Sequence, residues 1–269
     1  MLGSSGASVA RLTDELAGVI GGGANGAAVG DGLLAAAGVL RGQAALRRAA
    51  TDPSTESEAR SGLARSVFAG HLDGPALDLV ANAAGARWGS SRDLPEALEK
   101  LGVIAIVKGA DSAGEGDRLE DELFAFGRAV VENPELRSAL SDPARSVADK
   151  QGLVSALLEG KATGATVRLA REAVNGTHGT VTNGLEEYSR TAAGARQRLV
   201  ATVRVATPLS EQQSTRLAAA LGRENNRPVH LNTIVDPGVV GGIHVEIGEF
   251  VVDGSISARV DDARRKVAG

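Results

Sequence analysis

The stretch from Val235 to Arg264 reads VDPGVVGGIHVEIGEFVVDGSISARVDDAR and decides the fold of the end of the chain. Apolar residues alternate with other residues from Val239 to Ile247 and again from Phe250 to Val252, which is the period of half-buried strands. Gly248-Glu249 is a candidate hairpin turn between these strands. Asp253-Gly254-Ser255 then turns the chain and can cap a closing helix. The stretch predicts two strands followed by a helix.

Upstream of this stretch the pattern predicts the rest of a small α/β domain. Leu199 to Val205 alternates as a strand, and Ser210 with Gln213 forms a plausible capping box for a helix that continues to about Arg223. Val229 to Val235 alternates again as a strand. Residues 197–269 are therefore expected to form a β-α-β-β-β-α domain.

Before residue 197 the apolar spacing is helical. In residues 93–196 we expect a bundle that includes helices over 93–108, 151–159, 164–175 and 181–196. The segment Asp93 to Lys108 carries a leucine stripe at its start and is apolar on all sides near its end, as in a helix packed between two bundles. A buried strand is the alternative, because Ile and Val are β-branched, and helix is favoured.

An internal repeat becomes visible when the sequence is compared with itself at an offset of 90 residues. Thr51-Asp52-Pro53 then aligns with Ser141-Asp142-Pro143, and sixteen identities fall within seventy ungapped positions. Residues 1–92 are accordingly interpreted as an additional, duplicated helical bundle, and the helix at 93–108 can belong to both copies. The expected fold is mainly α: two related bundles, with one helix shared if both copies use it, and then the α/β domain.

Glycines are frequent near the N-terminus. Ala7 to Ile20 is expected to be a short helix, and the run GGGANGAAVGDG from Gly21 to Gly32 is expected to be a flexible loop, because ordering glycine is costly in backbone entropy. A phosphate-binding loop is the sharper alternative. It is disfavoured, because no strand precedes the run and no Lys-Ser or Lys-Thr follows it.

Composition excludes several classes of function. The chain has 269 residues, 43% of them apolar, a formal charge of −4 and no cysteine. Mixed charge argues against nucleic acid as a partner, and the absence of cysteine excludes disulfides and thiolate metal sites. No run approaches the roughly 20 apolar residues that span a bilayer, so any attachment to a membrane is expected to be through a partner.

The candidates for chemistry are few. The four histidines are scattered: His71, His178, His230 and His244. His230 and His244 could be strand neighbours, but no carboxylate spacing completes a metal site with them. Adjacent carboxylates such as Glu186-Glu187 point about 100° apart on a helix and do not form an acid/base pair. We expect no catalytic residue, no cofactor and no metal, and therefore no enzyme.

The C-terminal stretch closely resembles the signature of the delta subunits of F-type ATP synthases, the family related to the mitochondrial protein that confers oligomycin sensitivity. The resemblance rests on the order of Asp236, Gly241, Gly242, Gly248, Asp253, Gly254, Ser255 and Arg259. These residues have structural roles in turns and strands. Residues 93–196 also resemble the six-helix N-terminal domain of the family, and the extra copy resembles the enlarged delta subunits of actinobacteria.

The resemblance implies a mechanical function in ATP synthesis driven by proton transport. It implies a stator subunit of the peripheral stalk whose helical domain binds the N-terminal helices of the alpha subunits and whose C-terminal domain binds the b subunit. Such a protein resists rotor torque and lies on the cytoplasmic face of the bacterial cell membrane as a peripheral protein, attached through partners. The alternative is a helical scaffold or adaptor protein outside the synthase.

The resemblance also implies a binding groove for the alpha subunits between the first and fifth helices of the bundle. In this sequence the first helix offers Leu101, Ile104 and Val107, and the fifth offers Val167, Leu169, Ala170 and Ala173. The alternative is that these side chains are core. If they form a groove, Leu169 is half exposed in the free protein, and Leu169→Asp weakens binding without unfolding the chain.

Overall fold

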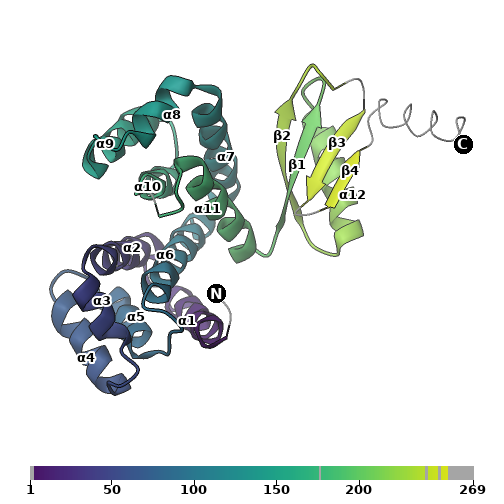
Figure 1. Ribbon diagram of the computed structural model, residues 1–269. Helices are drawn as coiled ribbons and strands as arrows, with labels where there is room; N and C mark the ends of the chain where they lie inside the picture. The colour runs from purple at the N-terminus through teal and green to yellow at the C-terminus, as the bar shows by residue number, and fades with distance from the viewer. Residues whose placement is uncertain (1–2, 176, 240–241, 248–249, 254–269) are drawn as a thin grey trace, which may run out of the picture. The chain divides into compact units, whose positions relative to one another are not determined.

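The computed structural model describes residues 3–175, 177–239, 242–247 and 250–253 (Figure 1). The chain divides into two compact units, Met1–Ala192 and Ala193–Gly269. The first is helical and the second contains a small sheet, so the predicted mainly α fold with a C-terminal α/β part is confirmed. Within the described residues, no helix is both long enough and apolar enough to cross a membrane.

The helical unit contains two groups of helices on either side of one long helix, α6 (Asp93–Ser112). The first group consists of α1 (Ser4–Gly21), α2 (Gly26–Gly42), α3 (Ala44–Thr51), α4 (Ser57–Phe68) and α5 (Gly74–Gly85). The second consists of α7 (Gly116–Glu132), α8 (Pro134–Ser141), α9 (Val147–Leu158), α10 (Gly164–Ala173) and α11 (Val181–Ala195). Below, the first bundle means α1–α5 and the second bundle means α7–α11.

The helix boundaries repeat with the period of the sequence. The helices α2, α3, α4 and α5 begin at residues 26, 44, 57 and 74, and α7, α8, α9 and α10 begin at residues 116, 134, 147 and 164, each 90 residues later. Gly70 and Gly160, which follow α4 and α9, have φ of 76° and 75°, the left-handed conformation that ends a helix and favours glycine. The 90-residue repeat is therefore visible in the helix starts as well as in the sequence, as the predicted duplication requires.

Helix α6 packs against both bundles (Figure 1). It contacts α1, α2 and α5 on one side and α7 and α10 on the other. Its side chains from Leu101 to Val107 are all buried, which accounts for a sequence that is apolar on all sides. The prediction of a helix at Asp93 to Lys108 is confirmed, and the alternative of a buried strand is wrong.

The glycine-rich run is only partly a loop. Helix α1 ends at Gly21, and α2 begins at Gly26, where the Asn25 side chain accepts hydrogen bonds from the backbone N–H groups of Ala27 and Ala28. The expectation of a flexible loop from Gly21 to Gly32 is therefore wrong for its second half. Glycine is costly in an isolated helix, but here close packing against α6 offsets that cost.

The C-terminal unit begins with β1 (Leu199–Val205) and continues through α12 (Glu211–Asn225) to β2 (Val229–Val235). The hairpin β3 (Ile243–Ile247) and β4 (Phe250–Asp253) completes a sheet of order β2-β1-β3-β4. β2 is parallel to β1, and the other pairs are antiparallel. Ser210 and Gln213 form the predicted capping box at the start of α12.

The core of this unit combines alternate residues of the strands with one helix face. Ala201, Val203 and Val205 on β1 and Val245 on β3 are buried together with Leu221 of α12. This is the period-two burial that the alternating sequence predicts.

Two details of the C-terminal unit differ from expectation. β3 begins at Ile243 rather than Val239, because Asp236 accepts hydrogen bonds in a turn from the backbone N–H groups of Gly238 and Val239. His230 and His244 are not strand neighbours, because β1 lies between β2 and β3. The expected closing helix lies outside the described residues.

Candidate functional site

The residues expected to line a groove are mostly core. On α6, Leu101, Ile104 and Val107 are buried, with exposed fractions of 0%, 6% and 0%. On α10, Leu169, Ala170 and Ala173 are also buried, and Val167 is half-buried. The expectation that Leu169 is half exposed in the free chain is therefore wrong, since its exposed fraction is 0%.

Helix α2 packs closely against a different set of α6 residues. A Cβ atom on Gly30 would lie 2.8 Å from the carbonyl oxygen of Gly102, and one on Gly26 would lie 2.6 Å from that of Ala105. Glycine at these positions lets the two helix backbones approach closely, because any side chain would collide with the facing helix. The first bundle thus packs on the α6 face that carries Gly102 and Ala105.

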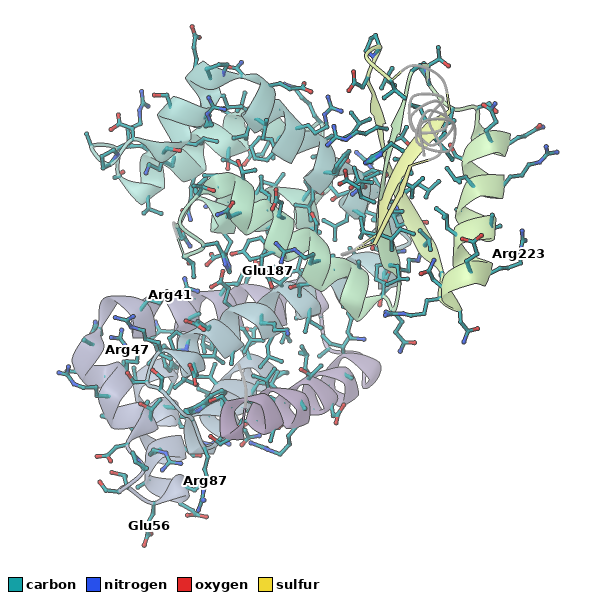
Figure 2. All side chains as sticks on the ribbon, turned by 45° about the vertical axis from the view of Figure 1, so that its right-hand side comes forward. Arg41, Arg47, Glu56, Arg87, Glu187 and Arg223 are labelled. Atoms are coloured by element: carbon teal, nitrogen blue, oxygen red, sulfur yellow. The ribbon has the colours of Figure 1, made fainter. Side chains whose placement is uncertain are left out.

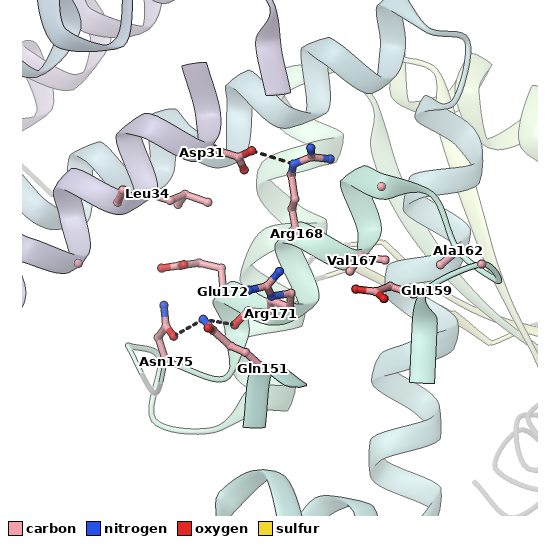
Figure 3. A pocket seen from close by; sticks show the side chains of 14 residues that line it. Asp31, Leu34, Gln151, Glu159, Ala162, Val167, Arg168, Arg171, Glu172 and Asn175 are labelled. Atoms are coloured by element: carbon pink, nitrogen blue, oxygen red, sulfur yellow. Dashed lines mark hydrogen bonds and ion pairs between the residues drawn. The ribbon is translucent and has the colours of Figure 1, made fainter. Parts of the chain in front are cut away.

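An open pocket of about 730 Å³ lies beside this contact, between α2, α9 and α10 (Figure 3). Leu34 of α2 and Val167 of α10 supply apolar surface, and Asp31 and Arg168 form an ion pair with an Nε–Oδ2 distance of 3.0 Å. Gln151 of α9 also lines the pocket, and its side chain donates hydrogen bonds to the carbonyl oxygen of Arg171 and to the Asn175 side chain. We call this space the α2–α10 pocket.

A buried polar cluster lies near the α2–α10 pocket, and Glu172 belongs to both. The Arg41 guanidinium of α2 donates to the carboxylates of Glu99 on α6 and Glu172 on α10, over 2.7 and 3.3 Å. The side chains of Glu99 and Glu172 are 4% and 11% exposed. Figure 2 marks Arg41 on the side of the first bundle that faces the second. One cation therefore joins three helices.

The same Glu99 carboxylate is held from the other side by α11 and the segment before it. Its Oε1 accepts a hydrogen bond from the Tyr188 hydroxyl and lies 3.1 Å from Nε2 of His178. The two rings meet edge to face, with centroids 5.6 Å apart. We call Arg41, Glu99, Glu172, His178 and Tyr188 the Arg41 cluster.

Burial shifts the ionisation of two members of the Arg41 cluster. It raises the pKa of Glu172 above the ordinary value, although the Asn175 hydrogen bond and the positive charge of Arg41 act in the opposite direction. Burial and the neighbouring negative charge of Glu99 raise the pKa of Tyr188, so its hydroxyl remains a proton donor. The cluster thus links α2, α6, α10 and α11 through hydrogen bonds, although Nε of Arg41 has no partner among the described residues.

Sequence reasoning did not find the Arg41 cluster. One signal was available, because Glu99 lies between Leu98 and Leu101 in a helix with buried residues along its length. A carboxylate in such a position requires a charged or hydrogen-bonding partner. Its partners could not be named, because Arg41 and Glu172 are far from Glu99 in the sequence.

The C-terminal signature residues that are described form turns and strand ends. Asp236 forms the turn before β3, Gly242 has a φ of 78° immediately before that strand, and Asp253 ends β4. Gly242 therefore precedes β3, although the strand was expected to begin at Val239. Gly241, Gly248, Gly254, Ser255 and Arg259 lie outside the described residues.

Comparison with known proteins identifies the family. Residues 104–267 match the family model described as ATP synthase delta (OSCP) subunit, which is more than half of the chain. The chain belongs to the ATP synthase delta (OSCP) subunit family. As a member of that family it is a structural subunit of an F-type ATP synthase, and the resemblance drawn from Asp236 to Arg259 is confirmed.

Relatives named ATP synthase subunit delta come from actinobacteria. One from a Nocardioides species is 49% identical over 243 residues, 90% of this chain and 88% of the relative. Those of Kineococcus radiotolerans and Streptomyces avermitilis are 44% and 46% identical, over 92% and 88% of this chain and 90% and 88% of the relatives. The match to these delta subunits extends well upstream of residue 104, where the family model begins.

Proposed function

We propose that the chain is a non-catalytic connector in the stator of an F-type ATP synthase. In this role it links the catalytic head to the peripheral stalk and resists rotor torque during proton-driven ATP synthesis. The observation that carries the proposal is the match to the delta (OSCP) family over residues 104–267. The high identity to relatives named ATP synthase subunit delta supports it further.

In this proposal the helical unit binds the N-terminal helices of the alpha subunits. Helix-in-groove binding requires apolar side chains that remain accessible in the free protein. Of the seven residues expected in the groove, Val167 is half-buried and lines the α2–α10 pocket, whereas the others are buried. We therefore place the test of head binding at Val167.

The C-terminal unit binds the b subunit of the stalk in the same proposal, and attachment to the cytoplasmic face of the membrane is through these partners. We divide the chain functionally into an additional bundle at residues 1–92, a delta-type bundle at 93–196 and a stalk-binding domain at 197–269. No cofactor, metal or catalytic residue takes part.

The experiment measures binding of the full chain to a purified alpha–beta head complex and to a b-subunit segment. We expect both to bind. Val167→Asp should weaken head binding at least tenfold, because it puts a charge on an apolar contact, and should leave binding of the b segment unchanged. Val147→Asp is the matched control, since Val147 is 46% exposed on α9 and does not line the pocket.

A folded wild-type chain that binds neither partner contradicts the proposal and favours the scaffold or adaptor alternative. If Val167→Asp and Val147→Asp weaken head binding equally, the connector role stands and the placement at Val167 is wrong.

A further inference from the structure

We propose that Arg41 fixes the second bundle against the first, so that the two bundles of Met1–Ala192 move as one body. This restraint lies within the helical unit and acts whichever partner the unit binds. The close contact at Gly26 and Gly30 already holds α2 and α6 together. The second bundle is attached to this pair through α10 and α11.

Side chains that join α2 and α6 to the second bundle differ strongly in exposure. Asp31 and Arg168 are 50% and 40% exposed, so their ion pair contributes little. Arg41 is 24% exposed and its two carboxylate partners are nearly buried. Removing one partner of a buried pair leaves an uncompensated charge and is strongly destabilising. Of the two ion pairs that join α2 to the second bundle, the one at Arg41 is therefore the stronger restraint.

The internal repeat indicates that this restraint is not part of the bundle fold itself. The residue 90 positions after Arg41 is Val131, which is 51% exposed. The residue 90 positions before Glu172 is Asn82, whose side chain donates a hydrogen bond to Glu15 on α1 within the first bundle. Arg41 and Glu172 are thus each replaced by an uncharged residue at the equivalent position of the other copy. We therefore assign them a role at the junction between the two bundles and not within either bundle.

Glu99 extends the restraint to α11. Its Oε2 accepts from Arg41 and its Oε1 accepts from Tyr188, so the two contacts use different oxygens of one carboxylate. Loss of Arg41 would leave Glu99 and Glu172 without their shared cation and would weaken the attachment of α10 to α2 and α6, while α11 would keep its contact through Tyr188. The expected result is a second bundle that swings relative to the first, not an unfolded chain.

Distance measurement between spin labels tests this directly, and the chain contains no cysteine that would interfere. Cysteines at the exposed positions Ser66 on α4 and Ser138 on α8 report the separation of the bundles. Ser66 paired with Ala17 on α1, and Ser138 paired with Ala156 on α9, report distances within one bundle. We expect a single narrow distance for all three pairs in the wild-type background.

In Arg41→Met the distance between Ser66 and Ser138 should lose its single narrow peak, while the two pairs within bundles keep theirs. Glu172→Gln, which retains the Arg41–Glu99 contact, should produce the same change to a smaller extent. Arg168→Gln is the matched control, since it breaks the exposed ion pair between the same two helices, and it should leave all three distances narrow. Hydrogen exchange in α10 should accelerate roughly 100-fold in Arg41→Met.

The proposal is overturned if the Ser66–Ser138 distance stays narrow in both Arg41→Met and Glu172→Gln. It is also overturned if Arg168→Gln broadens that distance as much as Arg41→Met does. If Arg41→Met also broadens the distances measured within each bundle, the substitution has disturbed the fold, and the proposal is then judged on Glu172→Gln. Broadening of the Ser66–Ser138 distance alone in Glu172→Gln then supports the proposal, and any other result overturns it.

Discussion

A Cβ atom on Gly30 of α2 would lie 2.5 Å from Cγ1 of Ile106 on α6. Ile106 is buried and cannot move without disturbing its neighbours, so Gly30→Ala should destabilise the chain by about 2 kcal/mol through overpacking. Urea unfolding followed by circular dichroism measures the change.

Gly38→Ala is the matched control in the same helix. No atom lies within 4 Å of a Cβ placed on Gly38, so alanine there should stabilise the chain by about 0.5–1 kcal/mol by reducing the entropy of the unfolded state. Equal effects of the two substitutions would show that the α2–α6 contact is not close enough to require glycine.

Leu169→Asp should unfold the helical unit. Leu169 has an exposed fraction of 0%, and burying a carboxylate without a partner costs several kcal/mol, on the order of the total stability of a domain. Val167→Asp, two residues away on α10 and half-buried, should remain folded. Thermal unfolding distinguishes the two, and a folded Leu169→Asp variant would contradict the burial of this residue.

Arg60→Met should cost about 3 kcal/mol. The Arg60 guanidinium is buried and donates hydrogen bonds only to backbone carbonyl oxygens, those of Asp52, Thr55, Ala84, Gly85 and Ala86. These carbonyls include those of Ala84 and Gly85 at the end of α5, where Gly85 would keep only the hydrogen bond from the Ser57 hydroxyl. Chemical denaturation measures the loss.

Lys150 occupies the equivalent position in the second copy and is the control for Arg60. Lys150→Met should change the free energy of unfolding by no more than about 0.5 kcal/mol, because Lys150 is half-buried. A loss as large as that of Arg60→Met would show that the two copies use this position in the same way.

Glu122→Gln should destabilise the chain at neutral pH but not in acid. Partial burial opposes ionisation of Glu122, but hydrogen bonds from the Thr166 hydroxyl, the Thr163 N–H and Arg118 outweigh it and lower the pKa of Glu122 below 4.5. A lowered pKa contributes stability above the unfolded value, and this stability is lost as the pH falls through the folded value.

We therefore expect Glu122→Gln to be about 1–2 kcal/mol less stable than wild type at pH 7, with the difference shrinking below pH 4.5. Melting temperatures across this range measure the difference. Glu132→Gln, at a side chain that is 59% exposed and paired with Arg128, should show little effect at any pH. A difference for Glu122→Gln that stays constant with pH would contradict the role of its charge.

Signals local in the sequence, such as capping residues and alternating apolar residues, correctly predicted helices and strands. Ser210 and Gln213 form their capping box, and β2 has the predicted bounds Val229–Val235. The offset of 90 residues also predicted matching helices, because the helix-ending signals at Pro53 and Pro143 and the glycines Gly70 and Gly160 were repeated.

Features that depend on a neighbouring helix could not be predicted in the same way. The segment Gly26 to Gly32 is unfavourable for a helix in isolation and becomes helical because α6 packs closely against it. Leu169 was assigned to a groove by analogy with the family, whereas its side chain is buried in the packing around α10. The Arg41 cluster combines residues from distant helices, which no spacing rule connects.

The position of α6 has a consequence for the history of the chain. A duplicated domain on a linker can be lost again by a simple deletion, but α6 supplies core side chains to both copies. Deleting residues 1–92 would expose the face of α6 around Gly102, Ala105 and Ile106, which now packs on α2. A chain shortened to the second copy would therefore need different side chains at these positions of α6.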